Sequence, residues 1–305
     1  MNKLTVIEKN VRTKLRCIIR MNTTSARQKQ TPTEYCLQLV RKNDYENFLC
    51  TLLLPRSIKS TAFAVRAFNV EVAQVEDQVS DSKIGTMRLQ FWTDALNRIY
   101  NGNPPKSPVA LELHRILQQH KLSKRYFKRL IDARLNKLNS SMFVDLESLE
   151  RYCDYTTSSI YYLLLEAQNI ASVNADHAAS HFGKAHGLVT LIRSVPYNAR
   201  KRVIILPQDI LLKYSISSES IFQRQSNAGF KDAILEIASC AKQHLKMATS
   251  LRKAGKNLNA IFLPTVCVEN YLEELKKVDF DVFHPTLQRR NGILPLQLLW
   301  RKIWS

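Results

Sequence analysis

The sequence predicts an all-α protein with a single folded domain, and three features of the chain support this. Glycine is rare, with seven among 305 residues, and the longest segments are rich in Leu, Ala, Gln, Lys and Arg, which favour helices. Apolar residues recur at helical spacing along nearly the whole chain. Strand-like alternation is scarce, and its nearest candidate is the short segment 203–206. No fixed-period repeat or low-complexity linker divides residues 31–305, so we expect one domain there.

The first helix is expected at Thr31-Pro32-Thr33-Glu34, where a Thr cap precedes an apolar run. Helical periodicity predicts helices at residues 33–42, 45–53, 58–80, 85–101, 107–119, 124–138, 147–168, 175–195, 230–253, 258–276 and 294–303. Breaks are expected at Pro55, 101–105, Pro196, Pro207 and Pro264. Because Pro264 lies inside segment 258–276, that helix is open to division there. Residues 213–230 are expected to form a surface connection or a short helix.

Composition excludes several classes of protein. No run of about 20 apolar residues occurs, so we expect no membrane-spanning helix. The chain has neither a Gly-x-Ser-x-Gly elbow nor a phosphate-cradling glycine loop, which leaves nucleophilic hydrolysis and nucleotide binding without support. The six cysteines show no Cys-x-x-Cys spacing, so we expect reduced thiols in a reducing compartment and no zinc ribbon.

The first 30 residues have the composition of a mitochondrial targeting segment. They hold eight basic residues and one acid, Glu8, and the apolar Leu4, Ile7 and Val11 recur on one helical face. An acid-poor, Arg-rich amphipathic start is typical of such segments, and a disordered basic tail is the alternative. Residues 1–30 contribute +7 to the formal net charge of +19, so the rest of the chain still carries +12. We therefore expect the folded body to be basic itself.

The segment from His177 to Gln208 contains five basic residues and neither Asp nor Glu. Its cationic side chains could attract a polyanion. Mg²⁺, however, is a hard cation that prefers carboxylate oxygens. This segment by itself therefore cannot hold magnesium ions.

Three segments carry a resemblance to a known family. They read Leu54-Pro55-x-x-x-Lys59-x-x-Ala62-Phe63-Ala64-Val65-Arg66-Ala67-Phe68-Asn69, then Met87-Arg88-Leu-Gln-Phe91-Trp92, and Arg193-Ser-Val-Pro-Tyr-Asn-Ala-Arg-Lys-Arg-Val-Ile-Ile-Leu206-Pro207. Together they resemble the squalene and phytoene synthases, which are head-to-head prenyl transferases, over most of residues 35–300. Tyr35-Cys-Leu-Gln-Leu-Val-Arg-Lys and Val278-Asp-Phe-Asp-Val-Phe-His-Pro look like the mitochondrial branch of that family, the complex I assembly factor 6 type. The resemblance implies an isoprenoid-synthase-like helical bundle around a central cavity.

Active members of this family hold Mg²⁺ on two Asp-rich helices that face each other across the cavity, because the metal ions neutralise the charge of the leaving diphosphate. Matched residue by residue, the first Asp-rich motif falls on Ala73, Gln74 and Asp77, of which only Asp77 is acidic. The second motif falls on Ser194 and Asn198, where both acids are replaced. The resemblance therefore implies a pseudoenzyme without a catalytic metal or cofactor.

Other substitutions accompany this loss. The family's Gln and Asn next to the second motif fall on Gly187 and Thr190. Asp77-x-x-x-Asp81 is a carboxylate pair at helical spacing and could form a first metal site shifted along the chain. It would supply carboxylates on only one side of the cavity. An active prenyl diphosphate transferase with an atypical metal site is thus the alternative function.

The resemblance also implies cationic candidates for binding an anion, namely Lys59, Arg193, Arg200, Lys201 and Arg202. In the family the run at 200–202 borders the diphosphate site. Here it could bind a diphosphate, anionic lipid or nucleic acid, or form a solvated loop. No recognised nucleic-acid module accompanies it, so we expect no nucleic-acid partner, and a basic RNA-binding protein is a third class to test.

Histidines form a further constellation. His177 and His181 are four residues apart, with Asp176 and His186 nearby, which would suit a transition metal. We prefer the simpler interpretation of a helix cap at Asp176 with surface or core histidines.

Two apolar segments have structural and functional interpretations. Residues 294–304 carry two Trp and two adjacent cations, which suits docking on a membrane surface, although packing on the core as the last helix is the interpretation that we favour. Residues at helical spacing in the segment 85–101 are assigned to the core. They are Met87, Phe91, Trp92, Leu96 and Ile99.

The resemblance implies a non-catalytic role in mitochondria, in the assembly of respiratory complex I (NADH dehydrogenase). The expected partners are complex I subunits or other assembly factors. The expected location is the matrix side of the inner membrane, with peripheral attachment. A cavity inherited from a prenyl synthase could also hold an isoprenoid-like ligand.

Overall fold

The computed structural model describes residues 30–140, 142–252 and 258–304, and it confirms the all-α prediction. The predicted targeting segment lies almost wholly outside these residues. The helices are α2 (Pro32–Asn43), α3 (Tyr45–Leu52), α4 (Arg56–Ala73), α5 (Ser82–Tyr100), α6 (Pro108–Leu117), α7 (Lys124–Asn139), α8 (Leu146–Cys153), α9 (Ser159–Ala167), α10 (Val173–Arg200), α11 (Gln208–Lys213), α12 (Ser218–Phe222), α13 (Ala228–Arg252), α14 (Thr265–Lys277) and α15 (Leu294–Trp304). Shorter turns are η1 (Glu76–Gln78), η2 (Asp154–Ser158) and η4 (Pro285–Gln288).

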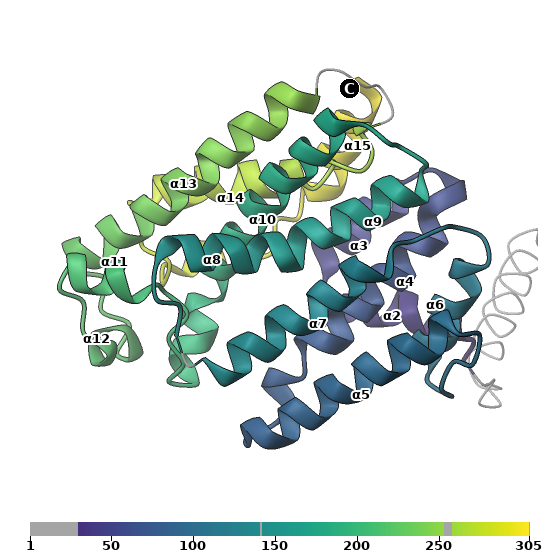
Figure 1. Ribbon diagram of the computed structural model, residues 1–305. Coiled ribbons are helices and arrows are strands. Elements are labelled where there is room, and N and C mark those ends of the chain that lie inside the picture. The colour runs from purple at the N-terminus through teal and green to yellow at the C-terminus, as the bar shows by residue number, and fades with distance from the viewer. Residues whose placement is uncertain (1–29, 141, 253–257, 305) are drawn as a thin grey trace, which may run out of the picture.

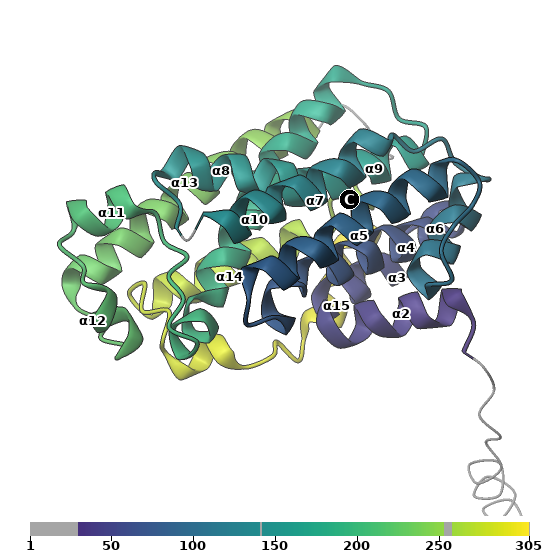
Figure 2. The same cartoon turned by 60° about the horizontal axis from the view of Figure 1, so that its bottom comes forward.

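Helix α10 runs through the middle of the bundle in both views (Figures 1 and 2). It packs along α13 on one side and against α8, η2, α9 and α14 on others. Helix α4 packs against α2, α6 and α9, and α5 lies outside α7. Helices α11 and α12 project at one end of the bundle. Helix α2 packs along α4, and α15 packs beside α14. The positions matched to the family's Asp-rich motifs lie at the end of α4, in η1 and on α10.

One large hydrophobic core extends through these helices. Aromatic rings fill its centre: the Phe182 ring centroid lies 4.9 Å from that of Tyr161 and 5.6 Å from that of Phe262. Packing is closest where α10 meets η2, since a Cβ added at Gly183 would overlap the backbone and side chain of Ser158. In the described part of the chain, no helix is long and apolar enough to cross a membrane.

Local sequence signals account for many of the helix ends. The Thr31 hydroxyl accepts a hydrogen bond from the Glu34 backbone N–H, and the Glu34 carboxylate accepts one from the Thr31 N–H, which confirms the predicted cap. Helix α14 begins after Pro264, where a break was predicted, and residues 258–264 form turns instead of the first part of the predicted helix at 258–276. The predicted helix at 147–168 contains the π-helical turn η2 between α8 and α9.

Other expectations were wrong. Helix α10 continues through Pro196 to Arg200, because Pro196 and its neighbours Val195 and Ala199 are buried against the core, and this packing outweighs the lost hydrogen bond. The segment 203–206 is an irregular connection, with no strand. On α5, Trp92, Leu96 and Ile99 lie in the core as predicted.

The remaining two α5 residues assigned to the core are exposed. Met87 is 72% exposed and Phe91 is 50% exposed. Helix α5 packs against α7 and α6, and these two residues lie on its solvent-exposed side. Helical spacing therefore identified the buried face of α5 correctly, but the predicted face was too wide.

Candidate functional site

A pocket of about 750 Å³ lies between the end of α4, the start of α3, α10 and the segment before α15. Four of the positions that the sequence analysis matched to the Asp-rich motifs line it, namely Ala73, Gln74, Asp77 and Ser194. Asn198 lies one turn further along α10 and is not part of the lining. The lining is mostly polar and includes Asn43, Asp44, Glu46, Asn47, Arg66, Asn69, Thr190, Arg193, Gln288, Arg289, Arg290 and Asn291.

The first degenerate motif ends α4 and continues into η1. Gln74 donates from Nε2 to Asn43 Oδ1 at 2.7 Å. Asp77 Oδ1 accepts hydrogen bonds from Lys201 Nζ at 2.7 Å and from the Tyr197 hydroxyl at 3.3 Å. Both donors to Asp77 come from the region of the second motif, at the end of α10. The end of α10 and the turn η1 therefore touch through an ion pair.

The shifted metal site at Asp77 and Asp81 is not formed. Asp81 is the N-cap of α5, and its side chain accepts from the Lys83 backbone N–H at 2.8 Å. Helix α4 ends at Ala73, so the two acids do not share a helical face. A cap of this kind is a structural role for an Asp before a helix.

The second degenerate motif is bonded internally. Asn198 donates from Nδ2 to the Ser194 backbone oxygen at 2.9 Å and to Ser194 Oγ at 3.1 Å. At Gly187, where the family has Gln, an added Cβ would lie 2.6 Å from Cys153 Cβ. The space for a longer side chain there is thus already taken by Cys153.

Arg193 faces an acid that the sequence analysis did not single out. Its guanidinium makes two hydrogen bonds to the Glu46 carboxylate, at 2.6 and 3.0 Å. Its carbon Cζ lies 5.4 Å from the Tyr271 ring centroid. Burial acts to lower the pKa of Arg193, but the carboxylate of Glu46 outweighs it and the pKa is raised. Arg193 is therefore a permanent cation held in place at the pocket wall.

A buried polar group lies deeper in the pocket. The Arg66 side chain is 3% exposed, and its Nη1 lies 3.9 Å from Asp44 Oδ2. Burial raises the pKa of Asp44, although the charge of Arg66 opposes this. Arg66 Nε and Asn47 Oδ1 find no hydrogen-bond partner among the described residues. Because buried polar atoms are costly when unpaired, these atoms suit a polar occupant of the pocket.

His186 belongs to the pocket and is not part of a histidine cluster. Its Nδ1 lies 2.7 Å from the Tyr161 hydroxyl. Burial first, and then the charges of Arg66 and Arg193, lower the pKa of His186 to about 3. The imidazole is therefore neutral and offers the pocket no positive charge. Asp176 does not cap α10 as predicted, since the N-cap is Ser172.

The predicted anion-binding residues are not gathered at one place. Arg193 lines the pocket and Lys201 pairs with Asp77, whereas Arg202 donates to Glu219 at 2.8 Å. Arg200 is exposed and outside the lining. Lys59 lies near the opposite end of α4, fourteen residues and so about 21 Å from Ala73.

The segment before α15 supplies cations that sequence reasoning missed. Arg289 and Arg290 line the pocket, and the Arg290 guanidinium lies 5.0 Å from the Tyr45 ring centroid. The adjacent arginines were visible in the sequence, but nothing local shows that residue 290 packs beside residue 45. Long-range packing alone assembles this rim.

The donor set does not fit Mg²⁺. Among the described residues three carboxylates line the pocket, and each contacts a cation: Asp44 contacts Arg66, Glu46 contacts Arg193 and Asp77 contacts Lys201. The remaining donors are amides, hydroxyls and guanidinium groups, which are poor ligands for a hard dication. The arrangement can instead bind an anion through its arginines.

Fold and sequence comparisons define the class of protein. The family model of squalene/phytoene synthases matches residues 40–293, so the chain belongs to the squalene/phytoene synthase family. A solved dehydrosqualene synthase superposes with a TM-score of 0.77, at 17% identity, over 90% of this chain and 95% of that one. A squalene synthase from Alicyclobacillus acidocaldarius gives a TM-score of 0.73 at 18% identity, over 82% and 95% of the two chains. These structures share the fold.

Within the family, the chain is more similar to another group of relatives. It is 46% identical over 272 residues to the protein of Bos taurus called "NADH dehydrogenase (ubiquinone) complex I, assembly factor 6", which covers 88% of this chain and 82% of the relative. The Homo sapiens protein of the same name is 45% identical over 274 residues, with the same coverage. A 15-cis-phytoene synthase of Synechococcus elongatus is 20% identical, over 89% of this chain and 90% of the relative.

Proposed function

We propose that this chain takes part in the assembly of respiratory complex I in mitochondria and does not catalyse prenyl transfer. One observation carries the non-catalytic half: of the five positions matched to the family's Asp-rich motifs, only Asp77 is acidic, and it contacts Lys201 at 2.7 Å. A single carboxylate cannot hold the group of metal ions that the reaction needs. The similarity to proteins named as complex I assembly factors supports the other half.

The chemistry of the family explains why the metal ions are indispensable. Ionisation of an allylic diphosphate builds negative charge on the leaving group, and metal ions offset that charge. Here the pocket has arginines for the diphosphate but lacks a group of free carboxylates to hold the ions. Arg66 and Arg193 could bind a diphosphate in its ground state, but they cannot supply the dications that lower the barrier.

The pocket supports a polar or anionic ligand better than an isoprenoid chain. Few of its lining residues are aliphatic: Val70, Ala73, Ile160, Leu287 and Leu294. Tyr161 of the lining packs against Phe182, which in turn packs against Phe262 in the core. An anion would meet Arg66, Arg193 and Arg289. The expected partners are complex I subunits or other assembly factors, with the ligand as a possible stabiliser of the fold.

Peripheral attachment to the matrix side of the inner membrane is proposed through α15. Leu294 and Leu298 pack against α3 and α14, which fits the expected last core helix. The outer side of α15 is nevertheless apolar and exposed, with Leu296 at 68%, Trp300 at 67% and Trp304 at 73%. Large apolar and Trp side chains beside cations are typical of helices that lie in an anionic membrane surface. We further propose that residues 1–30 direct import into mitochondria.

The test is genetic complementation in cells that lack the protein. Wild type and Asp77→Ala, at equal protein levels, are each expected to restore assembled complex I on native gels and NADH-linked respiration, with complexes II to IV unchanged. A variant without residues 1–30 is expected to fail unless a known import sequence replaces them. Failure of Asp77→Ala alone would show that residual carboxylate chemistry matters.

A direct assay addresses the alternative function. Purified protein with Mg²⁺ and farnesyl or geranylgeranyl diphosphate is expected to yield no condensed product and no released diphosphate. Metal-dependent turnover that disappears in Asp77→Asn would establish an active transferase. Salt-insensitive retention on heparin and RNA columns would exclude the RNA-binding class.

A further inference from the structure

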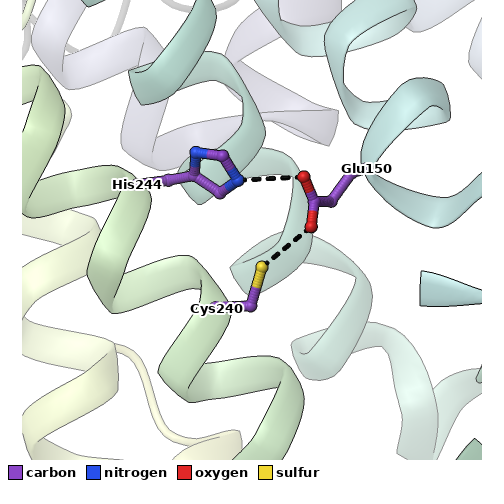
Figure 3. Close-up of side chains that lie close together, drawn as sticks. All are labelled: Glu150, Cys240 and His244. Carbon is purple, nitrogen blue, oxygen red and sulfur yellow. Dashed lines mark hydrogen bonds and ion pairs between the residues drawn. The ribbon is translucent and has the colours of Figure 1, made fainter. Parts of the chain in front are cut away.

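A second cluster of chemically active side chains lies away from the pocket, where side chains of α8 and α13 meet (Figure 3). Both helices pack against α10. Glu150 comes from α8, and Cys240 and His244 come from α13. Cys240 and His244 are four residues apart, so they lie on one face of α13 one turn from each other. Ninety residues of chain separate Glu150 from Cys240, and only the packing of the bundle brings them together.

The three side chains converge on one point. Cys240 Sγ donates to Glu150 Oε1 at 3.0 Å, and His244 Nε2 lies 3.0 Å from Glu150 Oε2. One sulfur, one imidazole nitrogen and one carboxylate oxygen lie within 4.8 Å of one another. Zn–S and Zn–N bonds are about 2.0–2.3 Å long, so small movements of these side chains would bring all three atoms to one metal ion.

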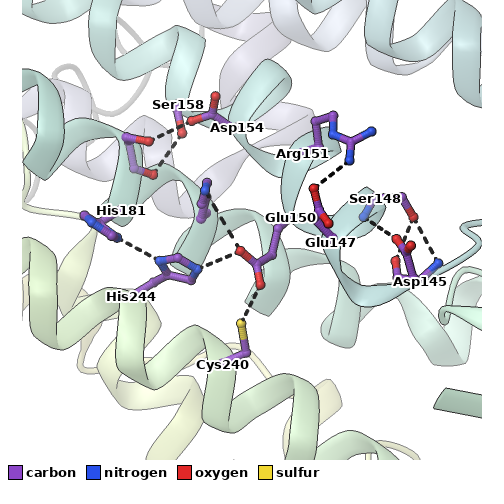
Figure 4. A network of polar contacts seen from close by, with 12 residues as sticks. Asp145, Glu147, Ser148, Glu150, Arg151, Asp154, Ser158, His181, Cys240 and His244 are labelled. Atoms are coloured by element: carbon purple, nitrogen blue, oxygen red, sulfur yellow. Dashed lines mark hydrogen bonds and ion pairs between the residues drawn. The ribbon is translucent and has the colours of Figure 1, made fainter. Parts of the chain in front are cut away.

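The neighbours of the cluster resemble the outer shell of a metal site (Figure 4). His181 of α10 places its Nδ1 2.8 Å from Nδ1 of His244. Ligating histidines usually bind the metal through one ring nitrogen and donate a hydrogen bond from the other. With a metal on Nε2, the Nδ1–H of His244 would donate to His181, and the imidazole would be fixed in orientation.

The cluster is accessible and distinct from the pocket. The side chains of His244 and Glu150 are 15% and 23% exposed. At about 100° per residue, His181 lies on the opposite face of α10 from Thr190, which lines the pocket. By spacing alone His177 lies beside His181, and the interpretation preferred from the sequence was separate surface or core histidines. In the structure His181 contacts His244 of α13, which spacing along one helix cannot reveal.

The donor set selects the type of cation. A thiol and an imidazole disfavour Mg²⁺ and Ca²⁺, which prefer oxygen. Burial, reinforced by Glu150, raises the pKa of Cys240 to about 12, so in the metal-free protein the thiol keeps its proton and donates a hydrogen bond to the carboxylate. A bound dication takes the place of that proton, which is released to solvent.

We propose that Glu150, Cys240 and His244 bind one zinc ion, with water as the fourth ligand. The ion bonds to Sγ, to Nε2 and to a carboxylate oxygen, and the thiolate and carboxylate neutralise its two charges. Three protein ligands and an open position fit tetrahedral zinc. The ion ties α8 to α13, so its effect is to stabilise this side of the bundle. The proposal is independent of complex I assembly.

The experiment measures the zinc content of the purified full chain after dialysis against metal-free buffer, and its affinity for zinc. One zinc per chain is expected, with a competing chromophoric chelator giving the affinity. Cobalt(II) in place of zinc is expected to show a thiolate-to-metal charge-transfer band in the near ultraviolet. Cys240→Ser is expected to lose the band and to weaken zinc binding by at least about tenfold, since outer-shell changes alone cost that much.

Matched controls lie on the same helices. Glu147 is one turn from the cluster on α8 and pairs with Arg151, so Glu147→Gln is expected to bind zinc as wild type does, whereas Glu150→Gln is not. His177→Asn on α10 is the control for His181→Ala, which is expected to weaken binding roughly 10- to 100-fold. His181→Ala leaves all three ligands intact, so it also serves if Cys240→Ser does not fold.

A further variant separates a metal site from a set of hydrogen bonds. Lys184 Nζ lies 3.9 Å from Glu150 Oε2 and repels any cation there. Lys184→Gln is therefore expected to tighten zinc binding about two- to fivefold. The proposal is overturned if wild type retains no zinc, or if Cys240→Ser and Glu150→Gln bind it as tightly as the two controls.

Discussion

The pocket is expected to give no measurable response to magnesium, and thermal melting can test this. Consider a functional carboxylate site with a Kd of about 0.1 mM for Mg²⁺. At about 10 mM Mg²⁺, which is about 100 times this Kd, binding would stabilise the folded protein by about 2.7 kcal/mol. For a domain of this size that free energy would raise Tm by about 5–10 °C. We expect no such rise, because the donors around Asp77 include no second free carboxylate.

The Lys201–Asp77 ion pair would not by itself prevent Mg²⁺ from binding to a functional site. Its side chains are 38% and 46% exposed, so the pair contributes only about 0.2–1 kcal/mol, and a dication could displace the lysine. The assay compares melting curves with MgCl₂ and with a monovalent salt of equal ionic strength. Asp77→Ala is the matched variant and is expected to melt within about 4 °C of wild type. A magnesium-dependent rise in Tm that Asp77→Ala abolishes would refute the reasoning.

Three more predictions concern packing, the pocket and the membrane. Gly183→Ala is expected to lower the free energy of unfolding by about 1–3 kcal/mol, because the added Cβ would overlap Ser158. Gly292 has open space around it, so Gly292→Ala should leave this free energy nearly unchanged. Urea titrations of both variants measure the difference. Calorimetry should show inorganic diphosphate binding about two- to fivefold more weakly to Arg289→Gln, while Arg200→Gln, outside the pocket, binds as wild type does. Trp300→Ser should reduce binding to anionic vesicles in flotation assays by roughly tenfold or more, and equal flotation of the variant would contradict a role for α15.

Local signals in the sequence predicted the local parts of the fold. The Thr31–Glu34 capping box and the stop at Pro264 depend on residues within a few positions of each other, and both were predicted. Pro196 was wrongly taken as a break, since proline disfavours a helix locally whereas the burial that retains α10 is a tertiary effect. Met87 and Phe91 show the reverse error, because periodicity cannot tell which side of α5 lacks a neighbour.

For the candidate site too, the sequence predicted some features and missed those that depend on tertiary packing. Matching to the family placed Ala73, Gln74 and Ser194 at the pocket, and the structure brings them there. Sequence reasoning could not find the partners of these residues, since Glu46 reaches Arg193 across 147 positions of the chain. The pairing of each pocket acid with a cation is a property of the packed bundle, and no spacing in the sequence reports it.

The position of the Arg289–Arg290 segment has a consequence for regulation. It forms one edge of the pocket and leads within four residues into α15, whose outer side exposes apolar side chains. Any surface that receives α15 would also restrain the arginines at that edge. Attachment of the protein and retention of an anion in the pocket would then strengthen each other by the same factor, as reciprocal linkage demands.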